Sequence, residues 1–404
     1  VTTNVAVYRF ADGVIDNAQP INLGAYRVGD GVSTVAVSVR NAAANDGFSE
    51  ALNASVGTVD AGFTASGAAT LVGAGASNVG GISVGLDTAI AGSQSGNARI
   101  DYVSDGTGTS NLGQSAAGSD TVALTGRVYG QAVAAVETPN IHFGIVHVGD
   151  AVGSQAVTVR NGALGTLTDT LLGSISAVPV GFTGAGSLGT AGLAQGQASN
   201  ALTVSLDTST AGVFSGNAII SFASHNDELT DLSLTDGTVA LTAQVNNYAN
   251  AVLAKSSDDG TLTVLPGQQF VFDFGTMTQG GTGVFGLLQL TNFVSGPADS
   301  LGADFDINAG SFSLGDFTSF NALQAGDGRS LTVGFNPLVA GLFEQVVRIN
   351  LFGENASGFR GSLGTFELTL RADVQTSAVP VPGAVWLLGS ALAGLAGLRR
   401  RKLV

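Results

Sequence analysis

The chain has 404 residues, 44% of them hydrophobic, which is enough for several folded domains and argues against wholesale disorder. Its 30 acidic and 15 basic residues give a net charge of −15, which argues against a nucleic-acid partner because neutralising phosphates requires a basic surface. The absence of Cys excludes thiol catalysis, Cys-bound zinc and disulfide bonds.

One sequence pattern occurs three times along the chain. Its opening reads INLGAYRVGDGVSTVAVSVRN at 21–41, IHFGIVHVGDAVGSQAVTVRN at 141–161 and, more diverged, FDFGTMTQG at 272–280. A later segment reads VGLDTAIAGSQSGNARI at 84–100, VSLDTSTAGVFSGNAII at 204–220 and LTVGFNPLVAGLFEQVVRI at 331–349. The pattern predicts three domains, at residues 1–130, 131–248 and 249–376, followed by a linker and C-terminal segment at 377–404.

Apolar and polar residues alternate within each copy. Val35, Val37 and Val39 are interleaved with Ala36, Ser38 and Arg40, a period of two that predicts a strand with one buried face. Such short segments recur about every ten residues, with Gly, Asn and Asp between them. The sequence therefore predicts an all-β protein made of sandwiches.

The order of these motifs resembles the Hydin-type, or ASH-like, immunoglobulin domains and the related choice-of-anchor modules of bacterial surface proteins. The resemblance covers nearly the whole chain before residue 376. It implies three tandem immunoglobulin-like β-sandwich domains that act as spacers or binding platforms, without a cofactor and without catalysis.

Two short motifs match enzyme patterns, and the repeats explain both. GISVG at 81–85 fits a nucleophile elbow, but Ser83 aligns with Thr203 and Thr332 inside alternating strands, which predicts a strand hydroxyl. GAGSLG at 184–189 fits a phosphate loop but lacks the preceding strand and following helix that such a loop needs, which predicts an ordinary loop. We expect no catalytic residues.

A weak calcium candidate lies in DFDINAG at 304–310. Asp304, Asp306 and Asn308 are spaced by two, as in a calcium loop, but Ala309 stands where an EF-hand requires Gly. The acidic residues are expected on the wet face of a strand, and we expect no bound metal.

Histidines and recurring Asp residues suggest structure more than chemistry. His142 and His147 are five residues apart, so on one strand they would face opposite ways, which does not favour a metal site. The Asp of the VGD motif, Asp30 and Asp150, predicts a turn in which the side chain bonds nearby backbone N–H groups.

The C-terminal segment reads VPVPGAVWLLGSALAGLAGLRRRKLV, residues 379–404. Residues 384–398 carry no charge, and four cations follow directly: Arg399, Arg400, Arg401 and Lys402. The composition predicts a single apolar helix in lipid, with the basic cluster holding its end in the cytoplasm. About 16 residues would span roughly 24 Å, short of the roughly 30 Å hydrocarbon core, so we expect a marginal transmembrane helix.

This layout resembles the sorting signal of PEP-CTERM proteins, most closely its VPLPA variant. The residues that carry the resemblance are Val379, Pro380, Val381, Pro382, Gly383 and Trp386. The sequence departs from the variant at Val381 and Gly383, where Leu and Ala are usual. The resemblance implies processing by an exosortase-like enzyme after anchoring in the inner membrane of a Gram-negative bacterium.

We therefore expect an exported, non-catalytic structural or adhesive protein of the cell surface or extracellular matrix. Surface polysaccharide or other matrix proteins are the expected partners, and no nucleic acid is expected. One alternative is a carbohydrate-binding surface protein, which requires an aromatic platform. A second alternative is a secreted hydrolase, which requires a pair of carboxylates in a cleft.

Overall fold

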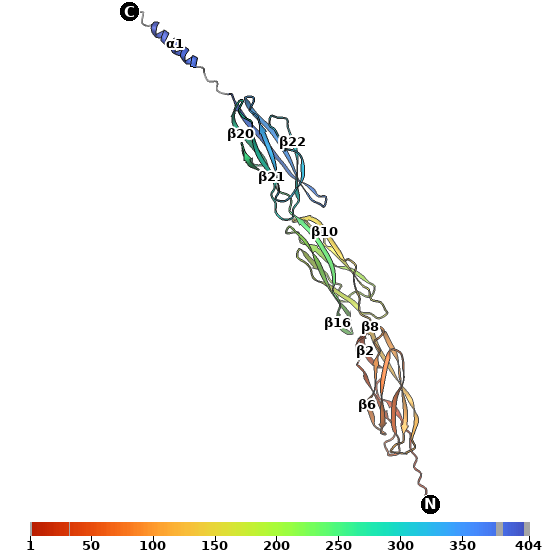
Figure 1. Ribbon diagram of the computed structural model, residues 1–404. Coiled ribbons are helices and arrows are strands. Elements are labelled where there is room, and N and C mark those ends of the chain that lie inside the picture. Colours follow the sequence, from red (N-terminus) through yellow and green to blue (C-terminus); the bar gives the residue numbers. More distant parts are fainter. Residues whose placement is uncertain (1, 32, 377–382, 400–404) are drawn as a thin grey trace. The chain divides into compact units, whose positions relative to one another are not determined.

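The computed structural model describes residues 2–31, 33–376 and 383–399. Within this part of the chain lie twenty-six strands and one helix, α1 (Gly383–Arg399) (Figure 1). The predicted all-β fold with one C-terminal helix is confirmed.

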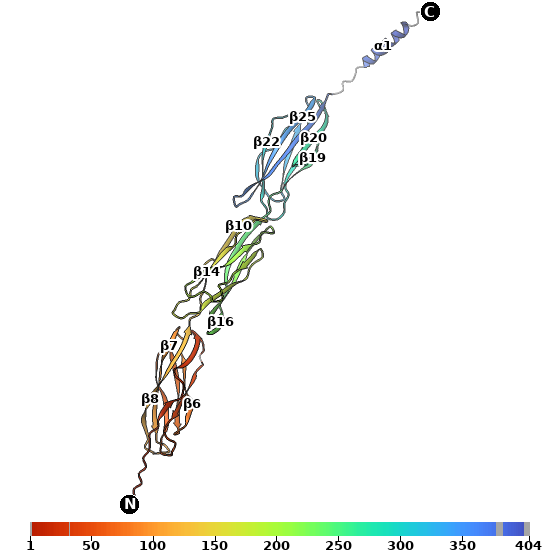
Figure 2. The same ribbon diagram turned by 180° about the vertical axis from the view of Figure 1, so that it is seen from behind.

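The first repeat is a β-sandwich of strands β1 to β8, of which β6, β7 and β8 are labelled in Figure 2. Its strands are β1 (Gly13–Ile15), β2 (Ile21–Arg27), β3 (Val35–Asn41), β4 (Ala51–Val59), β5 (Phe63–Val72), β6 (Ser77–Leu86), β7 (Gly92–Asp105) and β8 (Gln114–Tyr129). They follow the order β1-β3-β6-β5-β4-β7-β8-β2. The first half of β5 pairs with β6 and its second half with β4, so this strand belongs to both sheets.

A glycine allows β5 to change sheets. Gly67 has φ of +96°, and a Cβ there would lie 2.1 Å from the carbonyl oxygen of Gly81. Gly186 occupies the same place in the second repeat, with φ of +95° and a Cβ that would lie 2.0 Å from the oxygen of Ala201. Only glycine tolerates both the dihedral angle and the close approach.

The second repeat has the same strand order. Its strands are β9 (Ala134–Val136), β10 (Asn140–His147), β11 (Gln155–Asn161), β12 (Thr170–Ala177), β13 (Phe182–Ala185), β14 (Ala198–Leu206), β15 (Gly212–Asn226), β16 (Leu229–Ser233) and β17 (Gly237–Asn246). One sheet runs β13-β14-β11-β9 and the other β10-β17-β15-β12, with β16 on β15.

The third repeat keeps this order and adds an edge strand. Its strands are β18 (Ala251–Asp258), β19 (Thr261–Leu265), β20 (Gln269–Thr278), β21 (Val284–Asn292), β22 (Ser300–Ile307), β23 (Phe320–Leu323), β24 (Gly328–Phe335), β25 (Gly341–Glu354) and β26 (Arg360–Gln375). One sheet runs β18-β21-β24 and the other β19-β20-β26-β25-β22-β23. In the first and third repeats a parallel pair, β2 with β8 and β20 with β26, joins an early strand to the last one.

Contacts between Cα atoms group the chain into two compact units. The first comprises Val1–His142, Val152–Asp207 and Phe214–Thr242, and the second Phe143–Ala151, Thr208–Val213 and Ala243–Val404. Their boundary passes through β10, β15 and β17. The three domain boundaries expected from the sequence stay a prediction.

The alternation of burial follows the sequence pattern. Val37 and Val39 are buried in β3, whereas Ser38 and Arg40, which alternate with them, are partly exposed, as predicted. The core of the first repeat is mainly aliphatic, with Phe63 and Tyr102 as its buried aromatic residues. The core of the third repeat instead buries Phe270, Phe272, Phe312, Phe317, Phe335 and Phe366.

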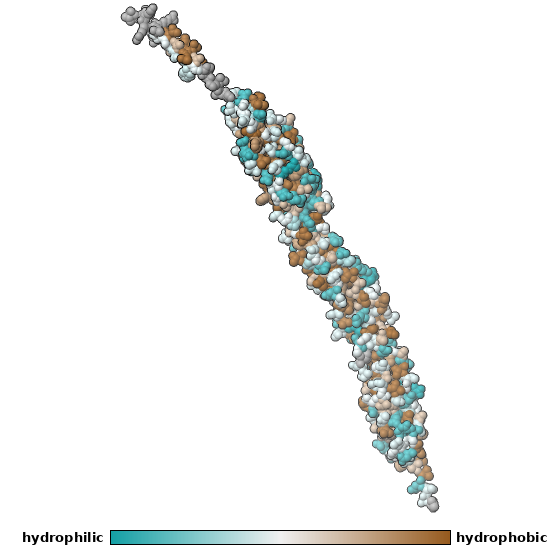
Figure 3. Space-filling view, viewed as in Figure 1, coloured by the Kyte–Doolittle hydropathy of each residue, from teal (hydrophilic) through white to brown (hydrophobic). Residues whose placement is uncertain are grey.

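Helix α1 begins at Gly383, within one residue of the predicted start. Its residues 383–397, Trp386 among them, are all exposed, and its apolar residues are brown in Figure 3. In the part of the chain that the structure describes, no helix is long and apolar enough to cross a membrane. Of the predicted sorting and basic residues, Val379, Pro380, Val381, Pro382, Arg400, Arg401 and Lys402 lie outside the described residues.

Candidate functional sites at the junctions between repeats

A basic side chain ends the same strand in the first two repeats. Arg27 is the last residue of β2 and His147 the last of β10, and both are buried. The VGD turn follows each of them. Asp30 Oδ2 accepts a hydrogen bond from the Arg27 N–H (2.7 Å), and Asp150 Oδ2 accepts one from the His147 N–H (2.8 Å), which confirms the predicted turn chemistry.

A buried carboxylate stands directly before one strand of the second and third repeats. Asp169 precedes β12 and Asp299 precedes β22, and both are fully buried. The Asp169 N–H donates to the carbonyl oxygen of Gly130 (2.8 Å), and the Asp299 N–H donates to that of Asn247 (2.9 Å). The segment that enters each repeat therefore fixes the backbone of the acid.

At the first junction, which lies in the first compact unit, the acid is paired with Arg27 of the preceding repeat. Arg27 Nε lies 2.6 Å from Asp169 Oδ2, and the guanidinium also donates to the carbonyl oxygens of Thr230 (2.9 Å) and Ser224 (3.2 Å). Asp169 accepts further bonds from Ser224 Oγ (2.7 Å) and Asn226 Nδ2 (2.5 Å). Both buried charges are thus paired and hydrogen-bonded, as burial requires.

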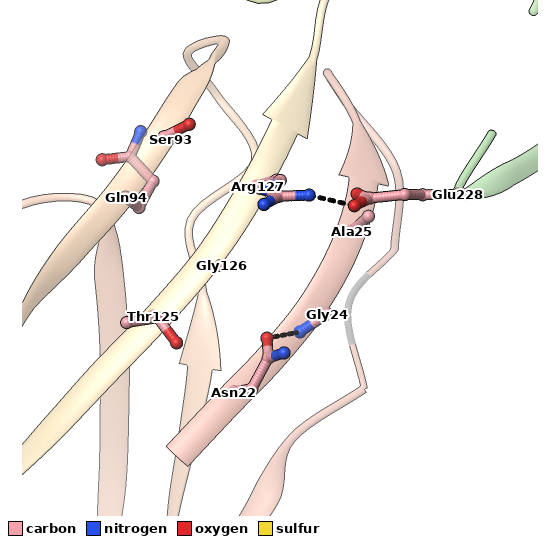
Figure 4. A pocket seen from close by; sticks show the side chains of 9 residues that line it. All are labelled: Asn22, Gly24, Ala25, Ser93, Gln94, Thr125, Gly126, Arg127 and Glu228. Carbon is pink, nitrogen blue, oxygen red and sulfur yellow. Dashed lines mark hydrogen bonds and ion pairs between the residues drawn. The ribbon is translucent and has the colours of Figure 1, made fainter. Parts of the chain in front are cut away.

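A second ion pair lies at the exposed edge of this junction. Arg127 of β8 pairs with Glu228 of the loop between β15 and β16, beside a pocket lined by Asn22 and Gly24 (Figure 4). The Tyr129 hydroxyl donates to Glu228 Oε2 (3.1 Å). Burial, followed by the hydrogen bond and negative charge of Glu228, raises the pKa of Tyr129 above its ordinary value.

At the second junction, which lies in the second compact unit, His147 takes the place of Arg27. His147 Nε2 lies 2.7 Å from Asp299 Oδ2, and Asp299 Oδ1 accepts bonds from Asn246 Nδ2 (3.0 Å) and Asn355 Nδ2 (2.8 Å). The imidazole stacks on Tyr248 with ring centroids 4.1 Å apart, and Phe359 lies at 4.4 Å. At the second junction, the stacking of the imidazole on Tyr248 takes the place of the two carbonyl contacts that the Arg27 guanidinium makes at the first junction.

The first repeat has a buried glutamate at the corresponding position, and hydroxyl groups bond it. Glu50 precedes β4 and is buried, and its carboxylate accepts hydrogen bonds from Ser104 Oγ (2.6 Å) and Ser110 Oγ. Ser104 is the counterpart of Ser224 at the first junction. In the first repeat, two hydroxyl groups of that repeat therefore bond Glu50. At the junctions, a basic side chain of the preceding repeat bonds Asp169 or Asp299.

A buried asparagine holds the backbone of all three acids. Its side-chain amide donates to the carbonyl oxygen of the acid and to a second carbonyl across the sandwich. The pairs are Asn41 with Glu50 and Val72 (both 3.0 Å), Asn161 with Asp169 (3.2 Å) and Leu193 (2.9 Å), and Asn292 with Asp299 (3.0 Å) and Leu323 (3.1 Å). This residue ends β3, β11 and β21, but nothing in the sequence indicated its role.

Of the two enzyme-like motifs, GISVG lies within a strand as predicted, whereas GAGSLG is not the loop that the sequence predicted throughout. Ser83 lies in β6 and its hydroxyl faces Ser66 of β5 at 3.4 Å. In GAGSLG, Gly184 and Ala185 end β13, and the rest is loop with no helix after it.

The two histidines of β10 do face opposite ways. His142 is exposed, with Nδ1 2.7 Å from Thr242 Oγ1, whereas His147 is buried in the second junction. Sequence reasoning missed the junction role of Arg27 and His147. The available signal was an alignment in which a basic residue recurs before VGD and an acidic residue recurs at positions 50, 169 and 299.

The calcium candidate has arginines beside its carboxylates. Asp304 Oδ2 lies 3.4 Å from Arg360 Nη2, and Asp306 stands opposite Arg348 in the ladder of β22 and β25. The backbone carbonyl of Asn308 accepts a bond from Gln345 Nε2 (2.7 Å). Among the described residues, no group of three or more His, Asp or Glu side chains is placed to hold a metal.

One pocket at the first junction has two acidic residues, which is the feature that the hydrolase alternative requires. It is lined by His225, Asp227 and Glu228 among others, but Glu228 is paired with Arg127 and Asp227 is fully exposed. A general acid in such an enzyme needs a carboxyl group in an apolar environment that keeps it protonated.

Neither the known protein families nor the curated proteins contain a match to this chain. Among solved structures, the chain is similar to a protein of unknown function from Porphyromonas gingivalis (12% identity, 59% of this chain, 99% of the other, TM-score 0.22). It is also similar to extracellular cadherin domains 1–5 of protocadherin gamma B2 (11%, 91% and 61%, TM-score 0.41) and to an ASH / PapD-like domain of human CEP192 (12%, 26% and 82%, TM-score 0.21). At these TM-scores the likenesses carry no information about function.

Proposed function

We propose that this protein is an exported, non-catalytic structural or adhesive protein of the cell surface or extracellular matrix. The observation that supports this most is the pair of junctions. In each, a side chain that ends a strand of one repeat pairs with the buried acid of the next. Such pairing serves to join modules in series, which is what a spacer requires.

The C-terminal segment supplies the proposed route to the surface. Helix α1 exposes apolar side chains on all sides, and soluble proteins avoid exposing a large apolar patch to water. We propose that an inner-membrane precursor holds this helix in lipid, and that an exosortase-like enzyme then cleaves near Pro380 and Pro382. Removal of Arg399, Arg400, Arg401 and Lys402 leaves 11 basic and 30 acidic residues, a net charge of −19.

The test uses the full chain in a Gram-negative host that carries an exosortase. Replacing the four cations by Gln should leave unprocessed precursor in the inner membrane, because the positive charges orient the helix. The wild-type chain should reach the surface fraction without its C-terminal segment, as read by mass spectrometry of the mature C-terminus. Normal processing of the Gln variant, or a C-terminal segment retained at the surface, would contradict the proposal.

One observation favours the carbohydrate-binding alternative. A groove at the second junction is lined by Tyr248, Phe293, Asn247 and Ser295, and both rings are exposed. Aromatic faces beside amide and hydroxyl groups suit the apolar face and the hydroxyls of a sugar. Retention of the chain on a polysaccharide column, lost in Phe293→Ala and kept in the matched variant Phe285→Ala, would establish this function.

A further inference from the structure

The loop between β24 and β25, together with the first two residues of β25, exposes three aliphatic side chains. We define residues 336–342 as the distal loop. Leu338, Val339 and Leu342 are 65%, 64% and 85% exposed. The distal loop contains no charged residue, so its transfer to an apolar phase carries no cost of burying a charge.

The other repeats do not share this composition. At the positions of Leu338, Val339 and Leu342, the second repeat has Ser209, Thr210 and Val213, and the first has Ala89, Ile90 and Ser93. Each of those loops exposes one large aliphatic residue, whereas the distal loop exposes three. The three aliphatic side chains of the distal loop are exposed and contribute little to the core of the third repeat. Core packing therefore does not explain why this loop is more apolar than the other two.

The distal loop lies at the end of the sandwich from which the chain leaves. Gly341 pairs with Val374 and Leu342 with Asp373, next to the last residue of β26, Gln375. On the other side, the Gly280 N–H donates to the carbonyl oxygen of Pro337 (2.8 Å). Helix α1 begins at Gly383, eight residues after Gln375, so the connecting chain reaches at most about 29 Å.

We propose that the distal loop contacts the lipid bilayer that holds α1 in the precursor, with its aliphatic side chains in the interfacial region. The inference rests on the proposed membrane-held precursor and adds a second lipid contact to it. A short connection to a helix in lipid keeps this end of the third repeat near the bilayer surface. Exposed, uncharged aliphatic side chains at that position gain from burial in lipid.

The composition of the chain allows the two contacts to be measured separately. Trp386 in α1 is the single Trp, so its emission reports on the helix alone. The chain has no Cys, so Val339→Cys can carry an environment-sensitive dye at a unique site. The matched control is Ile90→Cys, which labels the same loop position of the first repeat.

The full chain is added to vesicles of phosphatidylethanolamine and phosphatidylglycerol. We expect a blue shift of Trp386, a blue shift of the dye at 339, and quenching of both by spin-labelled lipid, with no change at 90. Replacing Leu338 and Val339 by Ser and Thr, the residues of the second repeat, in a chain labelled at Leu342→Cys should abolish most of that dye's shift while Trp386 still responds.

Three results would overturn the inference. If Trp386 shifts but the dye at 339 does not, the loop is not a lipid contact although the helix is. If the dye at 339 shifts as protein concentration rises without vesicles, a second copy of the chain covers the loop instead. If Trp386 itself does not respond, the membrane-held precursor is wrong and the inference falls with it.

Discussion

The two junctions bond a buried acid at the same position of the repeat with different basic side chains. At the first, a guanidinium donates to Asp169 and to two backbone carbonyls, while at the second an imidazole bonds Asp299 and stacks on Tyr248. Five N–H donors allow Arg27 to bond two carbonyl oxygens besides its acid, whereas His147 bonds its acid through Nε2. At both junctions, hydroxyl or amide groups of other side chains supply the remaining bonds of the acid. The acid has the same position and the same backbone hydrogen bonds at both junctions, although its basic partner differs. We infer that the backbone around the acid is the common feature of the two junctions.

The largest effect should come from Arg27→Met. This change leaves Asp169 buried beside Ser224 and Asn226 without its counter-charge, which should lower the free energy of unfolding at the first junction by about 3–5 kcal/mol. Hydrogen exchange of peptides containing Gly130 and Asp169 would measure the loss. The double variant Arg27→Met, Asp169→Leu should recover most of it, and a single variant as stable as the wild type would contradict the account.

A smaller effect is expected from His147→Phe. The ring can still pack on Tyr248 and Phe359, so the change removes mainly the hydrogen bond to Asp299, at a cost of about 1.5–3 kcal/mol. Exchange in peptides around Asn247 and Asp299 should rise, while the first junction stays protected. His142→Phe is the matched control, and equal effects of the two variants would show that the buried bond contributes nothing.

The asparagines test what the junctions share. Asn161→Ala and Asn292→Ala each leave buried carbonyl groups without a donor, at a cost of about 1–3 kcal/mol. Because both hold the backbone of an acid in the same way, urea unfolding should report similar losses for the two. If the losses of unfolding free energy in the two variants differ by more than about 2 kcal/mol, the width of this range, the two asparagines do not have equivalent roles.

The smallest effect is a pH dependence at the first junction. The pKa of Tyr129 is raised in the folded chain, so its contribution to stability is complete below its ordinary pKa near 10 and is lost as the pH rises through the folded-state value. Tyr129→Phe should remove this alkaline loss, measured by hydrogen exchange above pH 10 in peptides at the first junction. The second repeat has Asn246 at the corresponding place, so the second junction should not show the same loss.

Much of the fold followed from the sequence because repetition and alternation are strong signals. The three copies of the pattern and the period of two in β3 predicted sandwiches, and the VGD motif predicted its turn. The switch of β5 between sheets was not predicted, since it depends on the close approach of Gly67 to Gly81, which only the folded chain reveals.

The junctions were harder to predict for a physical reason. Arg27 and Asp169 are 142 residues apart, and neither has a local pattern that requires the other. A basic residue in a strand is ordinarily solvated, so sequence alone favours an exposed position for Arg27. The C-terminal signal is a different case, because it is read from local composition, and much of it lies outside the described residues.

The most direct test is a double-mutant cycle on Arg27 and Asp169. The unfolding free energies of Arg27→Met, Asp169→Asn and the double variant would be compared with that of the wild type at the first junction. Our account predicts a coupling energy of at least about 1.5 kcal/mol, since the two charges are buried and in contact. Single effects that add to within about 0.5 kcal/mol would contradict the claim that this pair joins the two repeats.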